Sequence, residues 1–168
     1  MRVFLTGFMG SGKTTVGRLL AERLGVPFID LDHEIEAGAG RSVREIFAEG
    51  GEALFRRIEC EALAAALEAP DAVVATGGGT LTQEANRRLL AGRGVSVWLN
   101  PPFSVIAERI GALGKEDRPL FQDEAQALEL YRSRLTFYRR ADLELAIEPR
   151  ETPEEVAART ALLLKGAS

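Results

Sequence analysis

The chain has 168 residues, of which 46% are hydrophobic and 27% charged, values that suit a single globular domain. Its net charge of −4 gives no overall positive field, which argues against nucleic acid or an anionic membrane as a partner. The single cysteine, Cys60, excludes an internal disulfide and agrees with a reducing cytoplasm. The sequence shows no secretory signal and no transmembrane stretch, so we expect a cytoplasmic protein.

Short apolar runs alternate with helical patterns along the chain. The runs typical of buried strands are residues 2–6, 28–30, 72–76, 95–99 and 143–147. The helical patterns are residues 13–24, 43–48, 52–67, 84–90, 103–110 and 125–138, with a last helix from Pro153. This alternation predicts an α/β fold, a three-layer sandwich whose five-stranded parallel sheet is covered on both faces.

Residues 7–14 (GFMGSGKT) follow the first strand and fit the pattern G-x-x-x-x-G-K-[ST]. Glycines let backbone N–H groups curl around an anion, and the next helix adds partial positive charge at its N-terminus. Lys13 can reach nucleotide phosphates, and the Thr14 hydroxyl can ligate Mg²⁺. The alternative is a chance glycine turn, but the position between a strand and a helix favours a phosphate-binding loop.

Asp30 and Asp32 follow the second strand, two residues apart. In an extended segment both carboxylates would point to the same side. One could position Mg²⁺ or its waters, and the other could accept a hydrogen bond from a substrate hydroxyl. The alternative is structural, with Asp32 capping the next helix and Asp30 ending the strand. The phosphate loop one strand away favours the functional interpretation.

Three glycines, residues 77–79, follow the third strand at the sheet edge where ligands bind. They would let a ligand approach the backbone closely, unless they form only a flexible turn. A guanidinium can grip a carboxylate at two points, although most surface arginines are merely solvated. The arginines that could do so are Arg56, Arg57, Arg132, Arg134, Arg139 and Arg140.

Residues 111–123 have no clean period and are typical of a lid. Gly111 and Gly114 offer hinge points, and Lys115 and Arg118 could close over phosphates. A closing arginine would stabilise transition-state charge and exclude water. An ordinary surface loop is the alternative.

Together these segments resemble the shikimate kinases, P-loop enzymes that phosphorylate the 3-hydroxyl of shikimate with ATP. The likeness covers essentially the whole chain. A phosphate loop alone marks a vast superfamily, whereas an ordered set of motifs is far more specific. That set is GFMGSGKTTVGRLLA (7–21), FIDLDHEIE (28–36), FRRIE (55–59), ATGGG (75–79), RPL (118–120) and R-x-x-x-Y-R (134–139).

The resemblance implies the P-loop NTPase strand order 2-3-1-4-5. It also implies one kinase domain over residues 1–168, with a substrate-binding helical region at about 32–60 and a lid at about 111–123. Mg²⁺ would be the cofactor, ATP the co-substrate and shikimate the acceptor. The protein would be a monomer of the pathway to chorismate and the aromatic amino acids.

Roles for individual residues also follow from the resemblance. It implies that catalysis depends on Lys13, Asp32 and Arg118. It implies that ATP is bound by Gly10, Ser11, Gly12, Lys13, Thr14, Thr15, Arg109, Arg118 and Pro153, with Arg109 and Pro153 enclosing adenine. It implies that shikimate is bound by Asp32, Arg56, Gly77, Gly78, Gly79 and Arg134, with the two arginines on the carboxylate. Mg²⁺ would be held by Thr14 and, through water, by Asp30. Whether Asp32 deprotonates the attacking hydroxyl or only orients it stays open.

Two alternatives remain at this level. One is another small kinase of the same fold, for gluconate or a nucleoside monophosphate; Arg56, Arg134 and the three glycines argue against it. The other is a nucleotide-binding regulatory protein that has lost catalysis. A mere binder would not need Lys13, Asp32 and Arg118 together.

Overall fold

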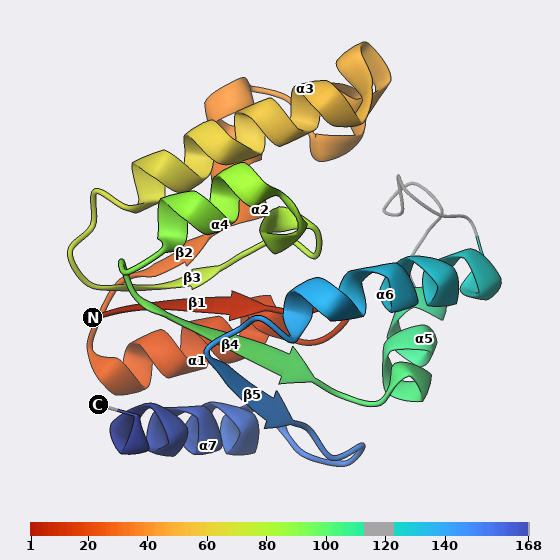
Figure 1. Cartoon of the computed structure of the whole chain (residues 1–168). Coiled ribbons are helices and arrows are strands. Elements are labelled where there is room, and N and C mark those ends of the chain that lie inside the picture. Colours follow the sequence, from red (N-terminus) through yellow and green to blue (C-terminus); the bar gives the residue numbers. More distant parts are fainter. Residues whose placement is uncertain (113–122, 168) are drawn as a thin grey trace.

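A computed structural model describes residues 1–112 and 123–167, which form three layers (Figure 1). Within these residues the middle layer is a five-stranded parallel sheet with the order β2-β3-β1-β4-β5. Its strands are β1 (Arg2–Thr6), β2 (Phe28–Asp30), β3 (Ala72–Ala75), β4 (Val95–Asn100) and β5 (Leu143–Ala146). The predicted fold class and strand order are confirmed, and every strand matches its predicted bounds within one residue.

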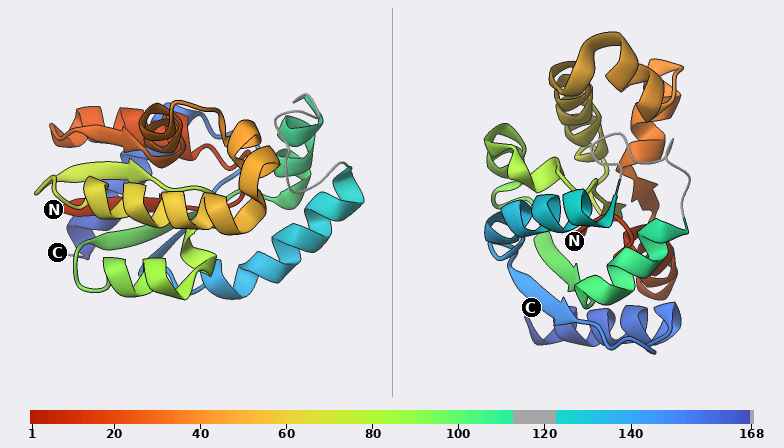
Figure 2. Two further views of the ribbon diagram at one scale, coloured as in Figure 1. Left: turned by 90° about the horizontal axis from the view of Figure 1, so that it is seen from above. Right: turned by 90° about the vertical axis from the view of Figure 1, so that its right-hand side faces the viewer.

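Helices cover both faces of the sheet (Figures 1 and 2). One face carries α1 (Lys13–Leu24) and α7 (Pro153–Gly166). The other carries α2 (Leu31–Ala39), α3 (Val43–Ala66), α4 (Glu84–Leu90) and α6 (Glu124–Tyr138). In β1, Val3 and Leu5 pack toward α1 and α7 whereas Phe4 packs toward the opposite layer. This alternation is what a strand buried on both faces requires.

The helix α3 spans the two helical patterns predicted at residues 43–48 and 52–67. The Ser42 hydroxyl accepts a hydrogen bond from the Glu45 amide at 3.1 Å, and the Glu45 carboxylate accepts one from the Ser42 amide at 3.2 Å. This capping box fixes the start of the helix. At Gly51 the backbone has φ 67° and ψ −164°, which interrupts the helix. The two predicted helices are therefore the two arms of one kinked element.

The remaining elements lie at the edge where β1, β3 and β4 end. A 3₁₀ turn, η1 (Thr80–Thr82), follows the three glycines, and α5 (Phe103–Gly111) follows β4. The predicted lid at residues 111–123, with Lys115 and Arg118, lies almost entirely outside the described residues. Among the residues that are described, no helix is both long and apolar enough to cross a bilayer.

Gly17 lies on the buried face of α1, so replacing it should change the stability of the protein. A β-carbon there would be 2.6 Å from Phe28 Cε2 and 3.2 Å from Leu5 Cδ1. We expect Gly17→Ala to lower the free energy of unfolding by about 1–3 kcal/mol, because overpacking outweighs the gain of about 1 kcal/mol in helix propensity. Urea denaturation would measure this change.

The matched control is Gly38→Ala in α2, where a β-carbon would meet nothing within 4 Å. This variant should be as stable as the parent protein or slightly more stable. Equal stabilisation of both variants would contradict the conclusion that a β-carbon at position 17 has no room between the helix and the sheet.

Candidate active site

The phosphate loop connects β1 to α1, as its sequence predicted. Gly7, Gly10 and Gly12 have φ of 146°, 80° and 96°, which side chains other than glycine rarely adopt. The Lys13 amine donates hydrogen bonds to the carbonyls of Gly7 at 2.8 Å and Phe8 at 2.9 Å. The loop is thus already curled, and the Lys13 side chain lies across it, where it can contact a bound phosphate group.

The charge on Lys13 is destabilised by its surroundings. Burial and, to a lesser extent, the Arg134 guanidinium lower the pKa of this amine from 10.5 to about 8. The carboxylates of Asp32 and Asp30 oppose this shift. A phosphate anion beside the amine would restore the charged form, so the loop is electrostatically prepared for an anionic ligand.

Asp30 holds the phosphate loop and the next helix together. One carboxylate oxygen accepts a hydrogen bond from the Thr14 hydroxyl at 2.7 Å. The other accepts from the amides of Asp32 at 3.1 Å and His33 at 3.3 Å, so Asp30 is the N-cap of α2. The structural alternative for this pair named the wrong residue, because it gave the capping role to Asp32.

Asp32 lies in the first turn of α2 and not in an extended segment, so the strand-based argument for its direction was wrong. The physical reason is the cap: Asp30 satisfies the first free amides, and the helix starts directly after β2. The Asp32 carboxylate nevertheless points into the site, with Oδ1 only 3.3 Å from the position of a β-carbon on Gly77.

Asp32 has a strongly shifted titration. The pKa of its carboxyl is raised from 3.8 to about 6, chiefly because protein atoms desolvate the carboxylate, although the residue is exposed on one side. Lys13 opposes this rise, whereas the negative charges of Asp30, Glu59 and Glu36 contribute to it. A carboxylate that titrates close to neutral pH is suited to exchange a proton with a hydroxyl.

The three glycines, Gly77 to Gly79, form a wall against which two arginines lie. A β-carbon on Gly79 would be 2.3 Å from Arg56 Nη2 and 2.9 Å from Arg134 Nη2. A β-carbon on Gly78 would be 3.0 Å from Arg134 Nη1. A larger residue would displace the guanidinium groups from the positions that they occupy against this backbone, so these glycines are more than a flexible turn.

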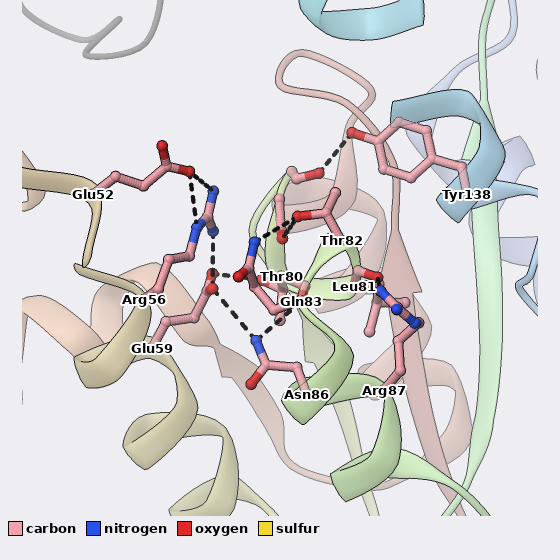
Figure 3. Close-up of polar contacts among 12 residues, drawn as sticks. Glu52, Arg56, Glu59, Thr80, Leu81, Thr82, Gln83, Asn86, Arg87 and Tyr138 are labelled. Carbon is pink, nitrogen blue, oxygen red and sulfur yellow. Dashed lines mark hydrogen bonds and ion pairs between the residues drawn. The ribbon is translucent and has the colours of Figure 1, made fainter. Parts of the chain in front are cut away.

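A buried carboxylate that the sequence analysis missed orients one of these arginines (Figure 3). Glu59 is fully buried, and its carboxylate accepts hydrogen bonds from Arg56 Nη1 at 2.9 Å and from the Thr80 hydroxyl at 2.8 Å. The more exposed Glu52 accepts from Arg56 Nε and Nη2, each at 3.3 Å. Glu59 follows Arg56 by three residues and therefore lies on the same helical face. This spacing is the feature of the sequence that could have indicated their contact.

Three adjoining hollows run along this edge of the sheet. The first lies beside Arg109 and Pro153, and Arg109 Nη1 donates to the Gly10 carbonyl at 2.7 Å. The second is lined by the phosphate loop, and the third by Arg56, Arg134 and the glycines. Asp32, Gly77 and Gly78 line both the second and the third. The larger hollow between α2 and α3 contains none of these residues and is remote from the chemistry.

The six arginines that the sequence offered for a carboxylate lie in two different places. Arg56 and Arg134 line the third hollow, and Arg134 is buried with its guanidinium 5.7 Å from the centre of the Phe8 ring. The others lie on the surface outside that hollow: Arg57, Arg132, Arg139 and Arg140.

Comparison with known proteins identifies the family of the chain. The family described as shikimate kinase matches residues 9–165 of the chain. The chain belongs to the shikimate kinase family. It therefore catalyses the ATP-dependent phosphorylation of shikimate, and the activity predicted from the sequence is confirmed.

Individual relatives cover nearly all of the chain. A shikimate kinase from Ruegeria pomeroyi is 46% identical over 84% of this chain and 73% of its own length. A shikimate kinase from Thermosynechococcus vestitus is 44% identical over 94% of this chain and 86% of its own. The structure of a shikimate kinase from Acinetobacter baumannii in complex with shikimate aligns with a TM-score of 0.92 and 35% identity, covering 99% of this chain and 94% of that one.

The two shifted pKa values predict how activity depends on pH. As pH falls through about 6, Asp32 gains a proton and can no longer accept one, so kcat/KM for shikimate should fall. As pH rises through about 8, Lys13 loses its charge in the ATP-free enzyme, so kcat/KM for ATP should fall. Steady-state rates over this range would measure both limbs.

Saturating ATP provides the control. Its phosphates would raise the Lys13 pKa, so the basic limb should move to higher pH in kcat/KM for shikimate measured with saturating ATP. A basic limb that stayed in place would assign that ionisation to another group.

Proposed function

We propose that the carboxyl edge of the sheet is divided into a donor half, which holds ATP, and an acceptor half, which holds shikimate. The observation that carries this proposal is that Asp32, Gly77 and Gly78 line both the phosphate-loop hollow and the arginine-lined hollow. A hydroxyl bound on the arginine side would then face a phosphoryl group held on the loop side. Such positioning is the main requirement of phosphoryl transfer.

In the donor half, the phosphates are bound by the loop amides and by Lys13, and adenine lies between Arg109 and Pro153. The hollow beside these two residues supports that placement. The residues that we assign to ATP among those described are Gly10, Ser11, Gly12, Lys13, Thr14, Thr15, Arg109 and Pro153. Arg118 completes the set from the predicted lid, closing over the transferred phosphoryl group.

Mg²⁺ fits the donor half through Thr14 and, by way of a water, through Asp30. Their side chains are already joined at 2.7 Å, which places a hydroxyl oxygen and a carboxylate beside the phosphate loop. No group of three acidic, histidine or cysteine side chains among the described residues could hold a metal by itself. Mg²⁺ commonly keeps several waters and binds through one or two protein oxygens together with substrate phosphates. When bound, it would neutralise charge that develops on the phosphates.

In the acceptor half, Arg56 and Arg134 grip the shikimate carboxylate while Gly77, Gly78 and Gly79 contact the substrate through the backbone. Arg56 is preoriented by the buried Glu59, which reduces the cost of ordering it on binding. Asp32 accepts the hydrogen bond of the 3-hydroxyl. As the hydroxyl oxygen bonds to the γ-phosphorus, the bond to ADP breaks and the proton passes to the Asp32 carboxylate.

The chain works as one kinase domain over residues 1–168, in which residues 32–60 form the substrate-binding helices and residues 111–123 form the lid. We propose that it is a cytoplasmic monomer with no nucleic-acid or membrane partner. The net charge of −4 supports the absence of nucleic-acid and anionic-membrane partners, the single cysteine supports a reducing compartment, and the monomeric state is an expectation from the family.

The direct test measures ADP release with MgATP and one acceptor at a time: shikimate, gluconate or nucleoside monophosphates. We expect turnover with shikimate and none with the others. Turnover with only a nucleoside monophosphate would contradict the assignment of the acceptor half. ATP binding without transfer to any acceptor would support a regulatory protein.

Arg134 tests the carboxylate site. Arg134→Lys should raise the KM for shikimate by about tenfold or more while leaving the KM for ATP within about twofold, because a lysine cannot make the two-point contact. Arg132→Lys, on the exposed side of the same helix, is the matched control and should change neither constant. An equal loss for both substrates would contradict the separation into two halves.

Asp32 tests the proton transfer. Asp32→Asn should reduce kcat by about 10²–10⁴-fold with little effect on ATP affinity, and the residual activity should lose its limb near pH 6. Glu34→Gln, an exposed change in the same turn of α2, should leave kcat unchanged. Unaltered turnover in the Asp32 variant would remove this carboxylate from the mechanism.

A further inference from the structure

Tyr138 is the last residue of α6 and is completely buried. Its ring lies in the apolar cluster with Phe8 and Ile106, at 5.9 Å from the Trp98 ring. A phenylalanine would fill that space almost as well. The hydroxyl therefore needs a separate explanation, because burying a polar group is costly unless it is hydrogen-bonded.

The hydroxyl of Tyr138 joins two parts of the acceptor half. It donates a hydrogen bond to the Gly78 carbonyl at 2.6 Å (Figure 3). Arg134 lies one helical turn earlier on the same face of α6, and its positive charge opposes the rise in the pKa of the Tyr138 phenol. The hydroxyl thus ties the helix that carries this arginine to the glycine backbone of the carboxylate site.

The direction of the bond to Gly78 is fixed by chemistry. A carbonyl can only accept, so the phenol donates its one proton to the Gly78 oxygen. Burial raises the pKa of Tyr138 to about 12, although Arg134 opposes the shift. The proton therefore stays on the phenol throughout the working pH range, and the hydrogen bond to the carbonyl stays intact.

The space around Gly78 leaves little freedom for this arrangement. The position of a β-carbon on Gly78 is 3.0 Å from Arg134 Nη1 and 3.5 Å from the amide nitrogen of Met9. A shift of the glycine backbone by a few tenths of an ångström would change its distance to the guanidinium. The phenol bond is the side-chain contact that resists such a shift.

We propose that Tyr138 is a positioning residue of the shikimate site, which holds the Gly78 backbone at a fixed distance from the Arg134 guanidinium. This proposal rests on the proposed roles of Arg134 and Gly78 in binding shikimate. Tyr138 does not touch the reacting atoms, so its contribution is to substrate affinity and not to the chemical step.

The experiment compares Tyr138→Phe with Tyr131→Phe. Removing the Tyr138 hydroxyl should raise the KM for shikimate by about tenfold while kcat and the KM for ATP stay within about twofold. Tyr131 is the chain's other tyrosine and also lies on α6, and its hydroxyl has no hydrogen-bond partner in residues 1–112 and 123–167. Its variant should match the parent enzyme. A Tyr138 variant with an unchanged KM for shikimate, or with equal changes for both substrates, would overturn the proposal.

A double-mutant cycle separates positioning from a general loss of packing. In an Arg134→Lys background, Tyr138→Phe should raise the KM for shikimate by a smaller factor than in the parent enzyme, because the guanidinium whose distance from Gly78 the hydroxyl fixes is already absent. The same factor in both backgrounds would overturn the proposal. Parent enzyme that failed to phosphorylate shikimate would instead refute the proposed function itself.

A second substitution keeps the test informative if the phenylalanine variant does not fold. In a Tyr131→Phe background, fluorotyrosine at position 138 preserves the ring and makes the hydroxyl a stronger donor. The KM for shikimate should then change while the KM for ATP does not. An unchanged KM for shikimate in that protein would overturn the positioning role.

Discussion

Positive charge concentrated at one edge of the sheet is the constraint on which the rest of the site depends. Lys13, Arg56 and Arg134 converge there, and the lowered pKa of Lys13 shows that burial and a neighbouring guanidinium both act against its charge. The fold balances this charge with carboxylates. Glu59 is buried against Arg56, while Asp30 and Asp32 lie beside the lysine. Anionic ligands complete the balance, which favours a phosphate on one side and a carboxylate on the other.

Glycine is the residue type that makes this concentration of charge possible. At Gly79 a single added carbon would overlap with one guanidinium and press against the other. The phosphate loop uses glycine for a different purpose, since Gly10 and Gly12 adopt positive φ so that amides can face the ligand. Gly51 serves a third purpose, because its backbone conformation bends α3 just before the turn that carries Arg56. These glycines are thus fixed by space or by backbone conformation.

The polar contacts around the acceptor half form connected sets and not isolated pairs. Glu59 joins Arg56 of α3 to Thr80 of the η1 turn, and Tyr138 joins α6 to the Gly78 carbonyl. The backbone that follows β3 is therefore tied to helices on both of its sides. Such ties reduce the reorganisation that substrate binding would otherwise require.

The sequence by itself determined the parts of this protein that depend on neighbours along the chain. The phosphate loop, the Ser42–Glu45 capping box, the two helical patterns on either side of Gly51 and the five strands follow from local patterns, because caps, turns and periodicity involve residues a few positions apart. The role of Asp32 came from the resemblance, whereas the argument from an extended backbone was wrong. Tertiary structure alone decided that Asp30 bridges to Thr14, that Glu59 meets Thr80 and that Tyr138 reaches Gly78. These partners lie 16, 21 and 60 positions apart, and only the packing of helices on the sheet brings them together.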